Sequence, residues 1–334
     1  MSEHTSERKA NHIDLAYQSQ VRNLDNRFSY EPVLSAHPNS DFIPFEFLGK
    51  TMKHPLWVSS MTGGTAKAGV INERLARAAG KYGLGMGLGS CRIILNEDTY
   101  LTDFQLRKHI GAEHPFYANL GIAQLEELLE GKNINLVNEL IKRTETDGLI
   151  IHVNPFQEWL QPEGDRFTFS PLETIKRTID AIDHSIVVKE VGQGMGKASL
   201  KALLELPIDG IEFGAHGGTN FSALELFRAD ESTRDHYESL SFIGHNAGEM
   251  VDFCNTLVQE DKGYNDKHII ISGGIRGFLD GYYHRERLQM HSVYAQASAL
   301  LKHAEVGYDQ LDEYIERQMQ GYQLAQQYLT IRES

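Results

Sequence analysis

The sequence predicts an α/β protein, a single (β/α)8 barrel of the TIM type, from three observations. From residue 55 onward, short apolar runs alternate with segments whose apolar residues recur at helical spacing. There are eight such runs, and each ends in glycine or polar residues, as strands of βα units do. The chain of 334 residues, 41% of them hydrophobic, is long and apolar enough to bury the core of one barrel.

The expected strands follow one another at intervals of a few tens of residues. They cover residues 55–61, 83–90, 115–121, 148–154, 185–192, 210–216, 268–274 and 291–297. Helices are expected between them, among others at residues 71–82, 125–143, 170–182 and 198–206, where apolar residues recur every three to four positions.

Three regions are expected along the chain. Residues 1–54 form an N-terminal extension, residues 55–302 the barrel, and residues 303–334 a polar C-terminal helix rich in tyrosine and glutamine. No linker, repeat or low-complexity tract indicates a second domain. The single-barrel prediction therefore includes an extension at one end and a helical tail at the other.

The composition excludes several classes of protein. A net charge of −14 argues against a nucleic-acid-binding surface, which needs clustered Lys and Arg. No run approaches the roughly 20 apolar residues of a membrane span, and the first fifteen residues lack the apolar stretch of a signal peptide. The two cysteines, Cys91 and Cys254, indicate neither a disulfide framework nor a zinc site. A cytoplasmic protein without membrane or nucleic-acid partners is expected.

Residues that could carry chemistry follow the expected strands. In a (β/α)8 barrel the active site lies at the carboxyl ends of the strands. The runs here end in glycine, amide, hydroxyl or charged residues, a set that a purely structural barrel would not need. These ends are residues 59–65, 89–92, 118–121, 152–158, 189–192, 215–220 and 272–276.

Two glycine turns late in the chain suggest a phosphate site. Residues 216–220 (HGGTN) and 272–276 (SGGIR) would follow neighbouring strands of the barrel. Glycine lets backbone N–H groups approach a phosphate closely, and Arg276 adds a positive charge. Either turn alone could simply be a tight βα connection, but the pair together with Arg276 favours a phosphate cradle.

Lys189 lies inside the apolar strand IVVKEVG. An unpaired ammonium in a core is very costly, so this side chain is expected to meet an anion. The anion could be a ligand, such as a reduced flavin ring, or a carboxylate from a neighbouring strand. The residues alone leave both possibilities open.

The segment HVNPFQE offers His152, Asn154, Gln157 and Glu158 at one strand end. One carboxylate does not complete a metal site, but Mg²⁺ commonly takes one or two carboxylates together with phosphate oxygens and water. Glu158 with a bound diphosphate would suffice. The alternative is a loop whose polar residues face solvent.

Taken in order, the motifs resemble those of the type 2 isopentenyl-diphosphate isomerases. An N-terminal RK-x-x-H, a QE-x-x-x-PEGDR segment and the glycine turns together are specific for that family, whereas each glycine turn alone is weak. The resemblance runs from residue 8 to about residue 302. The matching residues are Arg8, Lys9 and His12, then Met61–Gly64, Ser90–Arg92, Asn119–Gly121, His152–Arg166, Lys189–Gly192, Gly217–Asn220 and Ser272–Arg276.

The resemblance implies FMN as cofactor, active in its reduced form, with NADPH as the reductant and Mg²⁺ held by Glu158. It implies interconversion of isopentenyl and dimethylallyl diphosphate by a 1,3-proton shift, a step of isoprene biosynthesis, in a homo-oligomer of four or eight chains. Lys189 would stabilise the charge of the flavin, and Gln157 would orient the substrate. The implied FMN contacts are Ser60, Met61, Thr62, Ser90, Asn119, Lys189, Gly214, Thr219, Gly274, Ile275, Arg276, Ala297 and Ser298. The implied substrate contacts are Arg8, Lys9, His12, Ser90, Cys91, Arg92, His152, Asn154 and Gln157.

Some positions depart from the family pattern. Cys91 stands where the family usually has glutamine, and Gly214 where a serine often touches the flavin. In the last βα unit, residues 278–304 replace the small-residue helix and the glycine-rich eighth strand that are usual in the family. Backbone N–H groups of Ala297 and Ser298 could still bind the flavin phosphate if φ at Ala297 is negative.

Two other functions fit parts of the sequence. An FMN oxidoreductase of the hydroxy-acid dehydrogenase type would share the barrel and the phosphate turns. It needs a histidine base and an arginine near the seventh strand, where Arg276 has no adjacent histidine and His216 lies in the other turn. A non-catalytic flavin-binding protein would explain the altered last unit. Lys189, Gln157 and Glu158, which packing does not require, argue against it.

Overall fold

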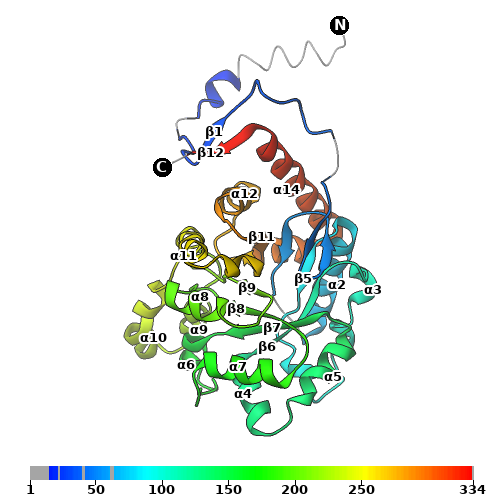
Figure 1. Ribbon diagram of the computed structural model, residues 1–334, viewed down its shortest axis with the longest axis vertical. Coiled ribbons are helices and arrows are strands. Elements are labelled where there is room, and N and C mark those ends of the chain that lie inside the picture. The colour runs from blue at the N-terminus through cyan, green and yellow to red at the C-terminus, as the bar shows by residue number, and fades with distance from the viewer. Residues whose placement is uncertain (1–14, 22, 40–41, 61–63, 333–334) are drawn as a thin grey trace.

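A closed barrel of eight parallel strands forms the centre of the protein (Figure 1). The computed structural model describes residues 15–332 except 22, 40–41 and 61–63. Around the barrel the strand order is β10-β11-β4-β5-β6-β7-β8-β9, so every expected strand is present and the predicted fold class is confirmed. The strands are β4 (Leu56–Val58), β5 (Gly85–Gly87), β6 (Phe116–Gly121), β7 (Gly148–Val153), β8 (Ser185–Glu190), β9 (Gly210–Glu212), β10 (His268–Ile271) and β11 (His291–Gln296).

Helices follow the barrel strands and cover the outside of the sheet (Figure 1). The expected helix 125–143 is two helices, because the chain turns at 131–134, where Lys132 has a φ of 57°. The α-helices are α2 (Ala66–Tyr82), α3 (Arg107–Ile110), α4 (Ile122–Glu130), α5 (Asn135–Thr144), α6 (Pro155–Leu160), α7 (Pro171–Ala181), α8 (Lys197–Leu204), α9 (Phe221–Arg228), α10 (Glu231–Tyr237), α11 (Ala247–Glu260), α12 (Phe278–Arg287), α13 (Ser298–Val306) and α14 (Tyr308–Tyr328). Short 3-10 helices are η1 (Arg92–Ile94), η2 (Leu101–Asp103), η3 (Glu238–Phe242) and η4 (Lys262–Asp266).

The barrel interior is filled by apolar side chains at its amino-terminal end. A hairpin of β2 (Phe45–Phe47) and β3 (Lys50–Met52) inserts Phe47 and Met52 among inward-facing residues of the strands, including Trp57 and Tyr117. The ring of Phe47 also contacts His268, the first residue of β10. Since this end is closed by packing, the opposite, carboxyl end of the strands remains for polar groups.

The C-terminal region differs from the single polar helix that the sequence predicts. Gly307 separates α13 from α14, and α14 buries Leu311, Ile315 and Tyr322 against the barrel. The chain then forms β12 (Leu329–Ile331), which pairs antiparallel with β1 (Phe28–Tyr30). Sequence patterns missed β12 because its partner lies about three hundred residues earlier in the chain.

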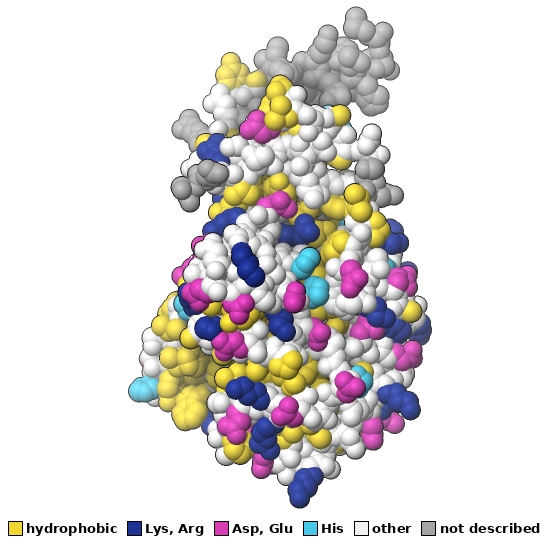
Figure 2. Space-filling model, in the orientation of Figure 1, with side chains coloured by type: hydrophobic (Ala, Val, Ile, Leu, Met, Phe, Trp, Pro, Cys, Tyr) yellow, Lys and Arg dark blue, Asp and Glu magenta, His cyan; other side chains and the backbone are white. Residues whose placement is uncertain are grey.

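The described part of the N-terminal segment before β2 lies, from Arg27 to His37, against α12 and α14 (Figure 1). Many of its apolar side chains face solvent, and Figure 2 shows the outer face of the molecule as a mixture of acidic, basic and apolar groups. The exposed apolar residues of this segment are Leu15, Tyr17, Val21, Leu24, Tyr30, Val33, Leu34 and Ile43. Within the described residues, no helix has the length and apolar character to cross a membrane.

Candidate active site

Three ionisable side chains form a row across the carboxyl ends of neighbouring strands. His152 on β7 is the register partner of Lys189 on β8, and Lys189 is the partner of Glu212 on β9. Because residues paired across a parallel sheet point to the same face, all three side chains share one side of the barrel wall. Lys189 and Glu212 are buried.

Lys189 is bound by groups from two other strands. Its Nζ donates to Oε1 of Glu212 over 2.5 Å and to Oγ of Ser59, which follows β4, over 3.0 Å. The Ser59 hydroxyl donates to the same Glu212 oxygen. A carboxylate from a neighbouring strand was one of the two partners expected for Lys189, and the structure contains it. Glu212 itself was not singled out from the sequence, although an acidic residue in the run GIEFGAH was the available signal.

His152 is held in one tautomer by Asn119. The amide nitrogen of Asn119 donates to the Leu88 carbonyl over 3.1 Å, which turns Oδ1 of Asn119 toward Nδ1 of His152, 2.7 Å away. Nδ1 must therefore carry the proton, and Nε2 offers a lone pair. Desolvation, and secondarily the positive charge of Lys189, lower the pKa of His152 to about 4. The imidazole is thus neutral at physiological pH.

This depressed pKa predicts a loss of stability in mild acid. The unfolded chain binds a proton at His152 near pH 6.5, whereas the folded chain does so only near pH 4, so the free energy of unfolding falls as pH drops between these values. We expect His152 to contribute about 1 to 2 kcal/mol of the loss between pH 7 and pH 5. Urea unfolding at both pH values should show a smaller loss in His152→Gln. An equal loss in both proteins would contradict the expectation.

The segment after β7 gathers the expected substrate and metal groups. Nδ2 of Asn154 donates to Oε1 of Gln157 (3.1 Å) and to Oε1 of Glu158 (3.0 Å). Nε2 of Gln157 reaches the buried Glu225 on α9 at 3.4 Å. The oxygen of the Asn154 amide is buried and has no hydrogen-bond partner among the described residues. Glu225 was missed from the sequence, where a glutamate inside a helical pattern gives no signal.

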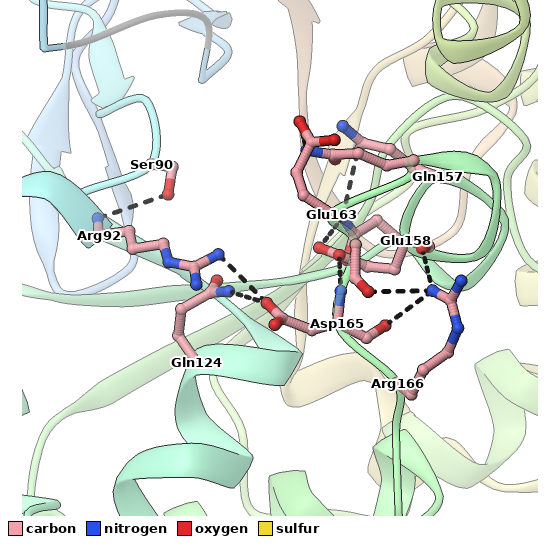
Figure 3. Close-up of polar contacts among 11 residues, drawn as sticks. Ser90, Arg92, Gln124, Gln157, Glu158, Glu163, Asp165 and Arg166 are labelled. Atoms are coloured by element: carbon pink, nitrogen blue, oxygen red, sulfur yellow. Dashed lines mark hydrogen bonds and ion pairs between the residues drawn. The ribbon is translucent and has the colours of Figure 1, made fainter. Parts of the chain in front are cut away.

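Asp165 links this segment to the expected diphosphate arginine (Figure 3). Its backbone N–H donates to Oε2 of Glu158 over 2.8 Å, and its carboxylate pairs with Arg92 over 3.1 Å. Gln124 also points to this carboxylate, at 3.2 Å, and the side chain of Ser90 lies beside Arg92. The structure therefore brings Ser90 and Arg92 to the same side of the barrel mouth as Glu158.

The two glycine turns touch one another as the sequence predicts for neighbouring strands. Gly214 donates its N–H to Oγ of Ser272 over 2.9 Å, and a Cβ added to Gly218 would lie 3.0 Å from the nitrogen of Gly274. Gly214 and Gly273 have φ values of 54° and 91°, a region that favours glycine. The backbone groups of the two glycine turns therefore lie close together.

The structure places the remaining expected contact residues in different surroundings. The side chain of Cys91 is buried in the hydrophobic core, and its N–H donates to the Asn119 carbonyl. Arg276, Thr219 and Ser298 are exposed, and Ala297 has a φ of −117°, which alanine tolerates. The expected residues Arg8, Lys9, His12, Met61 and Thr62 lie outside the described part of the chain.

The divergent last unit is anchored by the C-terminal helix. The Tyr314 hydroxyl on α14 donates to Oε1 of Gln296, a buried residue that ends β11, over 3.0 Å. The amide nitrogen of Gln296 in turn faces the carbonyl of Ile275 in the second glycine turn, at 3.5 Å. A helix outside the barrel thereby orients a side chain between the last two strand ends.

Removing the Tyr314 hydroxyl should destabilise the protein, because it removes the hydrogen bond to Gln296 at the end of β11. Tyr314→Phe leaves Oε1 of Gln296 unpaired, and we expect a loss of about 1 kcal/mol in the free energy of unfolding. Tyr308→Phe is the matched control, because no hydrogen bond of the Tyr308 hydroxyl is found in the described structure. Equal urea midpoints for the two variants would contradict this expectation.

Comparison with known proteins decides the family. No family model matches the chain. Isopentenyl-diphosphate delta-isomerase of Rickettsia felis is 34% identical over 317 residues, which are 93% of this chain and 88% of that protein. The enzyme of the same name from Rickettsia prowazekii is 34% identical over 307 residues, covering 90% and 86%.

The chain belongs to the isopentenyl-diphosphate delta-isomerase family. The resemblance carried by the motifs is thereby confirmed, and the chain is a member of an enzyme family. Solved structures with the same fold include the flavin-binding domain of baker's yeast flavocytochrome b2, with a TM-score of 0.62, 12% identity and coverage of 90% of this chain and 71% of that one. A mandelate oxidase variant with (S)-mandelic acid gives a TM-score of 0.58, 12% identity and coverage of 92% and 88%. At such identity the likeness concerns the barrel alone.

Proposed function

We propose that this isopentenyl-diphosphate isomerase family member interconverts isopentenyl and dimethylallyl diphosphate by a 1,3-proton shift on reduced FMN, with Mg²⁺ bound to the diphosphate. The observation that carries the proposal is the identity of about one third with isomerases over nearly the whole chain. The row of His152, Lys189 and Glu212 at the barrel mouth supports it, because the row places polar groups where barrel enzymes perform chemistry.

The polar groups at the mouth fit a flavin. Oγ of Ser60 and Oε2 of Glu212 are buried and lack hydrogen-bond partners among the described residues. Unpartnered buried oxygens at a functional site call for a ligand with donor groups or for water. The touching glycine turns supply backbone groups that suit a phosphate. Ser60, Asn119, Lys189 and the turn at Gly274–Arg276 would hold the cofactor.

The segment after β7 fits a magnesium ion that is shared with a substrate diphosphate. The Glu158 carboxylate lies beside the unpartnered amide oxygen of Asn154. Carboxylate and amide oxygens are the hard ligands that Mg²⁺ prefers. No group of three acidic, histidine or cysteine residues able to hold a metal occurs within the described ranges. Phosphate oxygens and water would therefore complete the coordination. Arg92 and Ser90 would bind the diphosphate on the other side of Asp165.

The protein residues would position the substrate and exclude water. When bound, reduced FMN supplies a proton-transfer atom and a negative charge beside the cationic character that develops on the protonated alkene. Gln157, fixed between Asn154 and Glu225, orients the alkene. Neutral His152 accepts a hydrogen bond at Nε2 and adds no positive charge to the site. Lys189 offers its ammonium to the flavin ring.

The oxidoreductase alternative finds no specific support in the side chains. His216 turns its Nε2 toward the Ser241 carbonyl at 3.3 Å, and the Arg276 side chain is exposed. A histidine base and an arginine acting on one carboxylate substrate would have to lie together. No hydrogen bond joins the two side chains in the described structure.

Anaerobic conversion of isopentenyl diphosphate tests the proposal. The purified protein is incubated with FMN, Mg²⁺ and NADPH, each omitted in turn, and the two isomers are separated. Dimethylallyl diphosphate should form only with reduced flavin and Mg²⁺, and NADPH should not be consumed in proportion to product. Flavin binding without any isomerisation would reject the proposed reaction.

Substitution of Glu158 tests the proposed metal ligand. Glu158→Gln should lower kcat/KM about 100-fold or more and raise the Mg²⁺ concentration at half-maximal rate, because a coordinating charge is lost. Glu173→Gln is the matched control, an exposed glutamate in the first turn of α7. Equal Mg²⁺ dependence in both variants would reject Glu158 as the ligand.

An oligomer of four or eight chains in the cytoplasm, with NADPH as physiological reductant, completes the proposal. The apolar side chains that the N-terminal segment exposes are a surface that association would bury. Light scattering of the purified protein measures the number of chains directly.

A further inference from the structure

The pairing of Lys189 with Glu212 bears on the electrostatics of the site. Nζ and Oε1 are 2.5 Å apart, the Glu212 side chain is fully buried and the Lys189 side chain is 10% exposed. Charges so close and so little exposed to water act over several ångströms without strong screening. The electrostatic field at the barrel mouth is therefore set by Lys189 and Glu212 together, and not by the Lys189 cation alone.

The pair is also fixed in direction. Ser59 donates to Oε1 of Glu212 and accepts from Nζ of Lys189, so one hydroxyl joins both members. Two of the three N–H donors of Lys189 are therefore used within the protein, and the third remains. Glu212 keeps a second oxygen, Oε2, that is buried without a partner among the described residues. Packing explains neither this unpaired oxygen nor a carboxylate in the barrel wall.

We propose that Glu212 is a positioning residue that acts through Lys189: it aims the ammonium at the flavin and, by balancing its charge, sets how strongly the site favours reduced over oxidised FMN. The inference rests on the proposed FMN function. Anionic reduced FMN carries one more negative charge than oxidised FMN. The site binds the reduced form more tightly when its own net charge is more positive. Glu212 thus restrains this preference and keeps the reduced flavin basic enough to exchange a proton.

Removing the charge of Glu212 and removing the charge of Lys189 should shift the reduction potential of bound FMN in opposite directions. Glu212→Gln leaves the cation unbalanced, so the reduction potential of bound FMN should rise. The ratio of its dissociation constants for the oxidised and reduced forms should increase about tenfold or more. Lys189→Met leaves the anion unbalanced, so the potential should fall. The double variant Lys189→Met/Glu212→Gln restores the charge balance and should lie between the single variants.

The measurement is the reduction potential of the FMN-loaded full chain, obtained by equilibration with a reference dye, together with FMN binding in both oxidation states. Glu126→Gln is the matched control, because Glu126 is also a buried carboxylate but lies on α4 and binds the N–H groups of Thr168 and Phe169. Its potential should equal that of the wild type. Opposite shifts in the two single variants would support the inference.

A merely structural role for Glu212 predicts a different pattern. Loosening the fold would weaken the binding of both flavin forms alike, and the potential of Glu212→Gln would stay at the wild-type value or shift in the same direction as that of Lys189→Met. Either result overturns the inference. If Glu212→Gln does not fold, the reduction potential of FMN in the double variant is compared with that in Lys189→Met. The double variant should have the higher potential. Equal potentials would overturn the inference.

Failure of the proposed reaction would look different. A wild-type protein that binds no FMN would reject both the reaction and the role of Glu212. A wild-type protein that binds FMN and shows the opposite shifts, but forms no dimethylallyl diphosphate, would retain the role of Glu212 and reject the isomerase. Potentials and product formation are measured separately, so each proposal is judged on its own result.

Discussion

Lys189→Met is expected to lower the free energy of unfolding of the ligand-free protein by about 3 to 5 kcal/mol, because it leaves the Glu212 carboxylate buried without its counter-charge. The hydrogen bond from Ser59 to Glu212 remains in this variant. It cannot compensate for the loss of the 2.5 Å charge-assisted hydrogen bond from Lys189, because a neutral hydroxyl is the weaker donor. Unfolding in urea, followed by circular dichroism, measures the loss.

Two further variants show whether the buried charge is the cause. In Lys189→Met/Glu212→Leu both charges are gone and apolar groups fill the space, so stability should return to within about 1 kcal/mol of the wild type. Lys197→Met breaks the exposed pair with Glu260 and should also cost no more than about 1 kcal/mol. If the double variant were as unstable as Lys189→Met, the lost packing of the lysine would be the cause.

Gly273→Ala is expected to destabilise the protein by about 2 to 5 kcal/mol and to abolish tight FMN binding. Gly273 has a φ of 91°, and an added Cβ would lie 2.1 Å from the Ala215 carbonyl oxygen. The unfavourable φ costs about 1 to 2 kcal/mol and the steric overlap about 1 to 3 kcal/mol. Relief requires the two glycine turns to separate, which removes the phosphate cradle.

Gly49→Ala separates the two causes. Gly49 has a similar φ of 71° in the turn between β2 and β3, but nothing lies within 4 Å of an added Cβ. It should therefore show the conformational cost alone, about 1 to 2 kcal/mol, and bind FMN as the wild type does. Thermal unfolding and flavin fluorescence measure both effects. Equal FMN affinity in Gly273→Ala and Gly49→Ala would show that the contact between the turns is dispensable.

The barrel could be predicted because each of its strands has a recognisable local sequence pattern. Each strand is a short apolar run that ends in glycine or a polar group, and the alternation with helices leaves few topologies. The strand β12 could not be found in this way, since three residues after a long helix carry no pattern of their own. Its structure depends on Phe28–Tyr30, far away in the sequence.

The site was predictable in part for the same reason. Residues directly after a strand, such as Asn154 and Ser90, are found by position alone. Glu212 sits inside a buried strand, and only the register between β8 and β9 shows that it meets Lys189. Cys91 illustrates the opposite case: it stands in a motif at the end of a strand, but its side chain is buried in the core. The direction of a side chain in a turn does not follow from sequence spacing.

The pairing of β1 with β12 has a consequence for the order of folding. Residues 28–30 are made early, yet their partner strand, residues 329–331, emerges from the ribosome only after all eight barrel strands have been synthesised. Contacts of such long sequence separation form late, because the chain between them must first become compact. The backbone of residues 28–30 should therefore remain sensitive to protease during synthesis and become protected as the last step of maturation.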